Sequence, residues 1–300
     1  MELEQSATYA NILPNQSADV SLILKPTHNT GNTSIEDIDR NVIILTSGPA
    51  FDAVHNAILD IYIYPMTILI AFIFIGLIGN GFVLYIFSFR WDRNKTTVFI
   101  ITLAALDICN CSINMPVEVS VFSTPMTFDY DLFCKLARCF SYINTATYSF
   151  VLVAVAYDRY LMICKPLKRM TYGTRYATRT CIGAGVLAVL TQFPSYFLYG
   201  TYVFRIPLPS GRNDTEVFVE GRTCLVTNYY YHVNPLPTYI FQGFLFVSHI
   251  IIFVTLCAVY VIIGRRLYMA SYVDMQENGQ RPGLLKKSIV SAITGIYTLN

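Results

Sequence analysis

The chain has 300 residues, of which 54% are hydrophobic and only 13% charged, and its formal net charge is +2. About a quarter of the residues in a soluble globular domain are charged, so this composition argues against such a domain and favours a polytopic helical membrane protein. The net charge is too small to suggest a nucleic-acid-binding protein.

The first 58 residues form a polar, acidic segment rich in Asn, Ser and Thr. They lack the basic start and short apolar core of a cleaved signal peptide, so we expect a disordered extracellular tail before an anchoring first span. Acceptor patterns for N-glycosylation begin at Asn15 and Asn32 in this tail, and at Asn213 in a later loop. Chance occurrence in a polar sequence is the alternative explanation of these triplets.

Long stretches with almost no charge predict an all-α transmembrane bundle over residues 59–300. A helix needs about 20 residues at ~1.5 Å each to cross the hydrocarbon layer, where its backbone must satisfy its own hydrogen bonds. The final segment is too short to cross, which indicates a fragment, a truncated isoform or a poor gene model. The expected spans are approximately 61–89, 96–120, 135–160, 179–201 and 238–264, with a partial sixth at 286–300.

The distribution of basic residues predicts the orientation of these spans. The loops 90–95, 159–179 and 265–287 contain fourteen of the 21 Lys and Arg residues. Because basic residues concentrate in short cytoplasmic loops, we expect these three loops inside the cell and the N-terminus outside. The predicted localisation is a multi-pass protein of the plasma membrane.

Two of the eight cysteines, Cys134 and Cys224, fall in loops expected outside the cell, where oxidation is favoured. A bridge between them would fasten the long loop before the fifth span over the mouth of the bundle. We expect this pair to form a disulfide and the other six cysteines to be free, apolar packing residues.

Polar side chains within the spans are costly in lipid and often functional. Asp107 lies in the middle of the second span, and Asn80 lies midway along the first. One interpretation is a polar clamp between two helices, and the other is an ion site or a protonation switch. Both interpretations remain open.

The third span ends in Asp158-Arg159-Tyr160 at the expected cytoplasmic boundary. Arg159 follows Cys134 by 25 residues, about 37 Å of helix at ~1.5 Å per residue, which is enough to connect the two membrane faces. A partly desolvated arginine at the rim of a bundle can exchange partners, which makes this pair a candidate two-state element.

These features together resemble the rhodopsin-like (class A) G-protein-coupled receptor family. The resemblance covers about residues 58–300 and implies a seven-transmembrane helix bundle, with five complete spans and a partial sixth present. The residues that carry it, in chain order, are Gly79-Asn80, the Leu-Ala-Ala-Leu-Asp run ending at Asp107, Cys134, Asp158-Arg159-Tyr160 and Cys224.

The resemblance also implies a mechanism. An extracellular agonist favours one packing of the helices, and a heterotrimeric G protein enters the cleft that opens at their cytoplasmic ends. Arg159 would hold Asp158 at rest and contact the G protein in the active form. Tyr260 would support the open form, Leu167 would insert into the G protein, and Asp107 would belong to a central polar cluster.

The chain also departs from the family pattern. Its only tryptophan is Trp91, so the fourth span lacks the usual one, and no proline stands near Ile252. Tyr148 occupies a position that often assists a sodium ion, which argues against sodium at Asp107. The aromatic–proline motif of the sixth span and the seventh helix are absent. A truncated, non-signalling or dominant-negative receptor is therefore the alternative.

Arg138, Ser141 and Tyr142 follow the first disulfide cysteine and form the expected ligand pocket. Ser141 stands where amine receptors of the family carry an acid, which disfavours a small amine. Arg138 would meet an anionic ligand group or extend to the membrane interface. The alternating sequences at 201–204 and 224–227 predict a β-hairpin like those of peptide receptors, so we expect a neuropeptide-type ligand.

Other protein classes are less consistent with the sequence. A transporter should show an internal repeat with broken helices, and none is visible. An enzyme needs converging catalytic side chains, but the four histidines do not cluster with acids or cysteines. We therefore expect no catalytic activity, cofactor or metal site, and the expected partners are the ligand, the G protein and the lipid bilayer.

Overall fold

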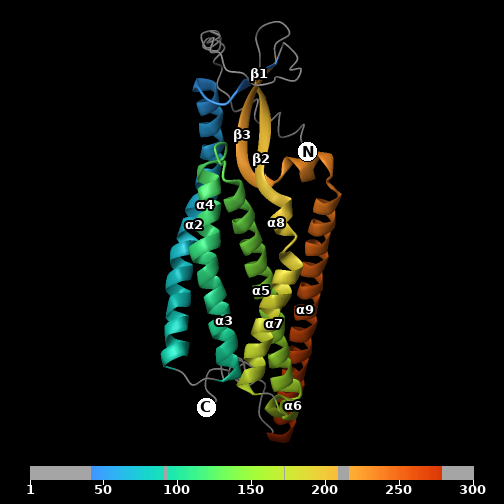
Figure 1. Ribbon diagram of the computed structural model, residues 1–300. Helices are drawn as coiled ribbons and strands as arrows, with labels where there is room; N and C mark the ends of the chain where they lie inside the picture. Colours follow the sequence, from blue (N-terminus) through green and yellow to red (C-terminus); the bar gives the residue numbers. More distant parts are fainter. Residues whose placement is uncertain (1–41, 91–93, 172, 209–215, 279–300) are drawn as a thin grey trace. The chain divides into compact units, whose positions relative to one another are not determined.

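The computed structural model describes residues 42–90, 94–171, 173–208 and 216–278 (Figure 1). Five helical stretches are long and apolar enough to cross a membrane, which confirms the five complete spans expected from the sequence. The three glycosylation acceptors and the expected partial sixth span lie outside the described residues. The five stretches are Pro49–Phe89, Lys95–Ser123, Asp131–Cys164, Thr174–Leu198 and Leu236–Ala270.

The described residues form α-helices, two short π-helical segments and three strands. The strands are β1 (Val42–Leu45), β2 (Tyr199–Leu208) and β3 (Glu216–Val226). The helices are α2 (Pro49–Phe89), α3 (Lys95–Cys109), α4 (Met115–Ser123), α5 (Asp131–Cys164), α6 (Pro166–Thr171), α7 (Thr174–Gln192), α8 (Ser195–Leu198) and α9 (Leu236–Asn278). The π-helical segments are η2 (Asn110–Asn114), between α3 and α4, and η3 (Tyr229–Val233).

The chain divides into two compact units, each built from parts of several helices. The hairpin unit comprises Met1–Ile78, Cys109–Ser141 and Pro194–Tyr239. The Arg159 unit comprises Gly79–Ile108, Tyr142–Phe193 and Ile240–Asn300. Within these ranges, the structure describes residues 42–90, 94–171, 173–208 and 216–278.

Large apolar side chains cover much of the helix surface. Phe72, Ile75 and Ile78 on α2 are 53%, 66% and 73% exposed. A helix that is apolar on all sides is stable where lipid, rather than water, surrounds it. The exposed face of α2 is therefore the face expected of a membrane-spanning helix.

The sheet of the hairpin unit has the strand order β1-β3-β2 (Figure 1). Strands β2 and β3 pair in antiparallel fashion, with Thr201 opposite Cys224, which confirms the expected hairpin. Strand β1 adds in parallel on the other side of β3, with Ile43 opposite Val217. The sequence did not predict this third strand, because a parallel partner far away in the chain leaves no local pattern.

The expected tail boundary at residue 58 falls inside α2. The first turns of this helix bury Phe51, Val54 and Ile58, which are spaced three and four residues apart and therefore lie on one helix face. They pack against Met126 and Val219 in the core of the hairpin unit. Burial of this face favours an ordered helix over residues 49–58, which the sequence assigned to the tail, and pairing with β3 orders residues 42–45.

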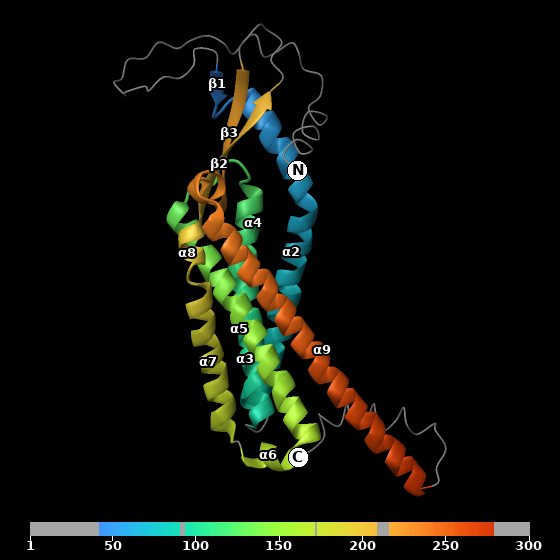
Figure 2. The same ribbon diagram turned by 90° about the vertical axis from the view of Figure 1, so that its right-hand side faces the viewer.

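The core of the Arg159 unit joins α3, α5 and α7, which run side by side in Figures 1 and 2. Its buried residues are Phe99, Val151, Ala177 and Ala184. The small residues Ala177 and Ala184 on α7 allow helix backbones to approach closely, as membrane helices commonly do. This packing positions the C-terminal part of α5, which carries Asp158 and Arg159.

Candidate functional site

A disulfide between Cys134 and Cys224 joins α5 to β3 within the hairpin unit, as the sequence predicted. The two Cα atoms are 5.6 Å apart, and the residues are 0% and 2% exposed. Val121 and Phe128 pack around them as part of the same buried cluster. The hairpin is therefore fixed to the first turn of α5.

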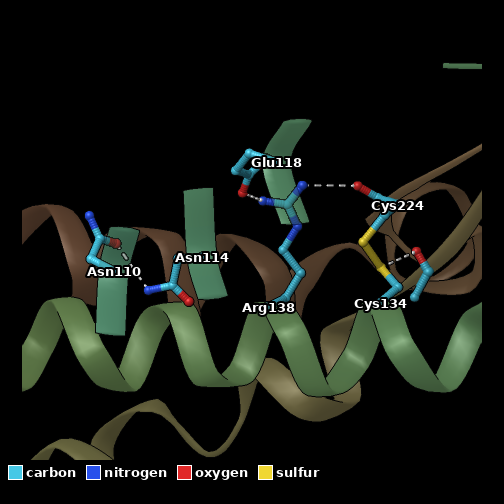
Figure 3. A network of polar contacts seen from close by, with 7 residues as sticks. Asn110, Asn114, Glu118, Cys134, Arg138 and Cys224 are labelled. Atoms are coloured by element: carbon cyan, nitrogen blue, oxygen red, sulfur yellow. Dashed lines mark hydrogen bonds and ion pairs between the residues drawn. A yellow bond between two sulfur atoms is a disulfide. The ribbon is translucent and has the colours of Figure 1, made fainter. Parts of the chain in front are cut away.

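One helical turn beyond Cys134, Arg138 forms an ion pair with Glu118 of α4 (Figure 3). Arg138 Nη1 donates to Glu118 Oε1, and Nη2 donates to the carbonyl oxygen of Cys224 at 3.3 Å. The two charged side chains are only 21% and 28% exposed. Because Glu118 neutralises the guanidinium, an anionic ligand group would have to compete with an existing partner of Arg138.

A row of polar side chains extends from Glu118 along the second span. Asn114 Nδ2 donates to Asn110 Oδ1 at 3.0 Å, and both residues belong to η2 (Figure 3). Among the described residues, Asn114 Oδ1 and Arg138 Nε are buried without a hydrogen-bond partner. Such groups are costly within a membrane span and often mark functional positions, as do π-helical segments.

The other two residues of the expected ligand pocket lie further along α5. Ser141 is half-buried and belongs to the hairpin unit. Tyr142 belongs to the Arg159 unit, where its ring meets that of Phe241 on α9 edge-to-face, with centroids 5.7 Å apart. Contact of these two residues with a ligand remains a prediction.

Side chains also hold one edge of the hairpin. Asp131 Oδ1 accepts a hydrogen bond from the Thr201 backbone N–H at 3.0 Å. Asn228 bonds to both backbone groups of Val203: its Oδ1 accepts from the N–H at 2.8 Å, and its Nδ2 donates to the carbonyl at 2.6 Å. Asn228 thus substitutes for a neighbouring strand at this point of β2.

The expected central polar cluster lies in the Arg159 unit. Asn80 on α2 and Asp107 on α3 are both half-buried, and a contact between them remains a prediction. The sequence analysis missed Asn144 on α5, which is 8% exposed and donates to the Leu106 carbonyl at 3.4 Å. The sequence could have indicated Asn144, because an amide side chain in the middle of an apolar span is often functional.

The Asp158-Arg159-Tyr160 motif occupies the C-terminal part of α5. Asp158 is buried at 8% exposure, whereas Arg159 and Tyr160 are half-buried. The Tyr160 ring lies near that of Tyr157, with centroids 6.4 Å apart, and Lys165 Nζ lies 5.9 Å from the Tyr160 centroid. The motif thus combines a buried carboxylate with a more accessible arginine.

Two apolar side chains predicted to act with this motif are exposed. Leu167, on α6, is 82% exposed, and Tyr260, on α9, is 53% exposed. Contact of either residue with a protein partner remains a prediction. Within the described part of the chain, no group of three or more His, Cys, Asp or Glu residues is placed to hold a metal ion.

Comparisons with known proteins are consistent with this arrangement. The family model described as "7 transmembrane receptor (rhodopsin family)" matches residues 79–294. Galanin receptor type 3 of Homo sapiens is 30% identical over 142 residues, 45% of this chain and 39% of the receptor. Cysteinyl leukotriene receptor 1 of Cavia porcellus is 25% identical over 239 residues, 78% of this chain and 62% of the receptor.

A third relative is the neuropeptide CCHamide-1 receptor of Drosophila melanogaster, which is 28% identical over 143 residues. The match covers 45% of this chain and 28% of that receptor. The chain thus spans less than two thirds of the length of each of these three relatives.

Proposed function

Since the chain belongs to the rhodopsin family of seven-transmembrane receptors, whose members are receptors rather than enzymes, we propose that it binds an extracellular ligand and activates a heterotrimeric G protein. The observation that carries this proposal is the Asp158-Arg159-Tyr160 motif in the C-terminal part of α5, the helix whose first turn holds the hairpin through Cys134. One continuous helix therefore carries both a ligand-side anchor and a candidate coupling motif.

The proposed orientation places the N-terminus outside the cell and the protein in the plasma membrane. Fourteen of the 21 Lys and Arg residues lie in three loops that alternate correctly with the five spans. The acceptor patterns at Asn15, Asn32 and Asn213 all fall on the opposite side from those loops. Basic loops inside and glycan acceptors outside form a consistent topology.

The proposed ligand is a peptide. One of the relatives is named a neuropeptide receptor and another a galanin receptor, although a third is named for cysteinyl leukotriene. Arg138, Ser141 and Tyr142 provide no acid for a small amine, and Glu118 already neutralises Arg138. A neutralised cation and two hydroxyl groups suit the amide groups of a peptide better than they suit a small amine, which needs a free acid.

The proposed coupling mechanism uses the residues of the Arg159 unit. Arg159 exchanges Asp158 for the G protein when an agonist favours the open packing of the helices. Tyr260 supports that packing, and the exposed Leu167 docks on the G protein. Asn80 and Asp107 form the central cluster that connects the ligand side with this end.

The direct test is nucleotide exchange on a purified heterotrimeric G protein, with the chain reconstituted in phospholipid nanodiscs. Galanin and CCHamide-1, the peptides that name two relatives, are suitable first probes, followed by a neuropeptide panel. We expect one peptide to accelerate exchange over the basal rate. Peptide binding without any acceleration would refute G-protein activation by this chain while leaving the ligand class intact.

A further inference from the structure

A cavity of about 310 Å³ lies among α3, α5 and α7 within the Arg159 unit. Its walls include four aromatic rings, those of Phe99, Phe150, Tyr157 and Tyr176. The carboxylate-bearing residue Asp158 also lines it. Its volume falls at the lower end of the range of about 300–1,000 Å³ that is typical of small-molecule sites.

The cavity is enclosed on one side and accessible on another. Phe99 and Asp158 are only 4% and 8% exposed, whereas Tyr157 and Tyr176 are 46% and 39% exposed. The two tyrosines therefore form the open rim, between helices long and apolar enough to cross a membrane. Most of the lining side chains are apolar, so a ligand that fills the cavity must itself be largely lipophilic.

The lining selects for positive charge. Aromatic faces attract cations, and a carboxylate in an apolar setting forms strong hydrogen bonds with a charged donor. None of the described Lys or Arg side chains lines the cavity. A carboxylate has about four acceptor positions, so Asp158 can keep a bond within the protein and accept another from a ligand.

The other polar groups of the wall are the uncharged hydroxyls of Tyr157, Tyr176 and Thr180. Thr180 donates its hydroxyl hydrogen to the Tyr176 carbonyl at 2.9 Å, so that hydrogen is already engaged. Asp158 is the only charged group among the residues that line the described cavity. The geometry therefore directs a donor group of the ligand towards this carboxylate.

We propose that this cavity binds a small lipophilic amine, whose ammonium group bonds to the Asp158 carboxylate while its apolar body lies against Phe99 and Phe150. None of the residues that line this cavity belongs to the expected ligand pocket of Arg138, Ser141 and Tyr142. Its regulatory consequence rests on the proposed function: an amine held by Asp158 competes with Arg159 for the carboxylate and shifts the coupling switch. Binding itself does not depend on a G protein.

The test uses a pair of photoreactive probes on the purified 300-residue chain in nanodiscs. The probes are 4-benzoylbenzylamine and its neutral analogue 4-benzoylbenzyl alcohol, followed by peptide mapping of the labelled residues. We expect the amine to label α5 and α7 around Tyr157 and Tyr176 roughly ten-fold more than the alcohol, the ratio that a charged contact of moderate strength provides.

Three variants make the test specific. Asp158→Asn, which keeps the size of the side chain, should reduce amine labelling to the level of the alcohol. Ala154→Leu, which fills the cavity, should reduce labelling by both probes. The control Asp60→Asn removes an exposed carboxylate of α2 that does not line the cavity, and it should leave labelling unchanged.

The proposal is overturned if the amine and the alcohol label wild-type protein equally, if neither labels this region, or if Asp158→Asn labels like wild type. These outcomes are independent of nucleotide exchange. A chain that binds the amine but fails to activate a G protein would refute the proposed function and retain the site.

Discussion

Glu118 on α4 and Arg138 on α5 are joined by an ion pair, and the same guanidinium donates to the carbonyl of Cys224 on β3. Arg138 therefore connects the second span, the third span and the hairpin, next to the covalent connection made by Cys134. A side chain that links three elements by charge-assisted bonds fixes their register more firmly than a surface pair would.

We expect Arg138→Ala to destabilise the hairpin unit by about 1–3 kcal/mol, because it leaves the half-buried Glu118 carboxylate without its partner. The matched control is Arg222→Ala, since Arg222 and its partner Asp129 are 46% and 61% exposed. Exposed pairs contribute about 0–1 kcal/mol. Thermal unfolding of the purified chain in detergent measures both changes, and equal losses would contradict the special role of Arg138.

Removal of the disulfide should lower the stability of the protein more than Arg138→Ala does. Cys134 and Cys224 are separated by 90 residues, and a bridge that closes a loop of this length stabilises by about 2–5 kcal/mol in the chain-entropy account. We expect Cys224→Ser to lower the melting temperature and the amount of protein at the cell surface. The control Cys257→Ser, at an exposed free cysteine, should behave like wild type. Unchanged surface levels after Cys224→Ser would contradict this prediction.

Arg159→Ala should abolish agonist-driven nucleotide exchange and leave expression and peptide binding largely intact. The guanidinium is half-buried at the end of α5 rather than part of a packed core, so its loss affects partner binding more than folding. Lys168→Ala, which removes an exposed charge from the neighbouring α6, is the control for general electrostatic effects and should keep most of the exchange rate. Full agonist response in Arg159→Ala would exclude the proposed role.

The features that the sequence predicted are those with a local signature. Runs without charge indicate spans, alternation near Thr201 and Cys224 indicates a hairpin, and two outer cysteines indicate a bridge. Each of these patterns can be recognised without knowing which helix faces which. The Asp158-Arg159-Tyr160 motif was visible in the sequence for the same reason.

The remaining features depend on contacts between distant segments. The partnership of Glu118 with Arg138 depends on how two helices are rotated about their axes, and the π-helical turn that ends at Asn114 changes the rotation of one of them. Strand β1 requires a parallel partner more than 170 residues away in the chain, as Ile43 and Val217 show. Opposite charges at matching ends of the second and third spans were the available signal for the ion pair.

The amide side chain of Asn228 provides the sharpest test of the hairpin, because it bonds to both the N–H and the carbonyl of Val203. We expect Asn228→Ala to speed hydrogen exchange at the Val203 amide by roughly five- to ten-fold, the effect of losing one hydrogen bond of about 1 kcal/mol. Asn228→Asp keeps an acceptor for the N–H, so hydrogen exchange at the Val203 amide should stay slow. Exchange measured by mass spectrometry on hairpin peptides checks both expectations.

The neighbouring amide of Thr201 is the internal control, since Asp131 accepts its hydrogen bond at 3.0 Å and Asn228 does not. If Asn228 acts locally as a substitute strand, its removal leaves the Thr201 amide unchanged, because the disulfide still holds Cys224 opposite Thr201. If hydrogen exchange becomes faster at both amides, the hairpin opens as one unit, and Asn228 supports the stability of the whole hairpin instead. An unchanged Val203 amide in Asn228→Ala would exclude any protective role for the side chain.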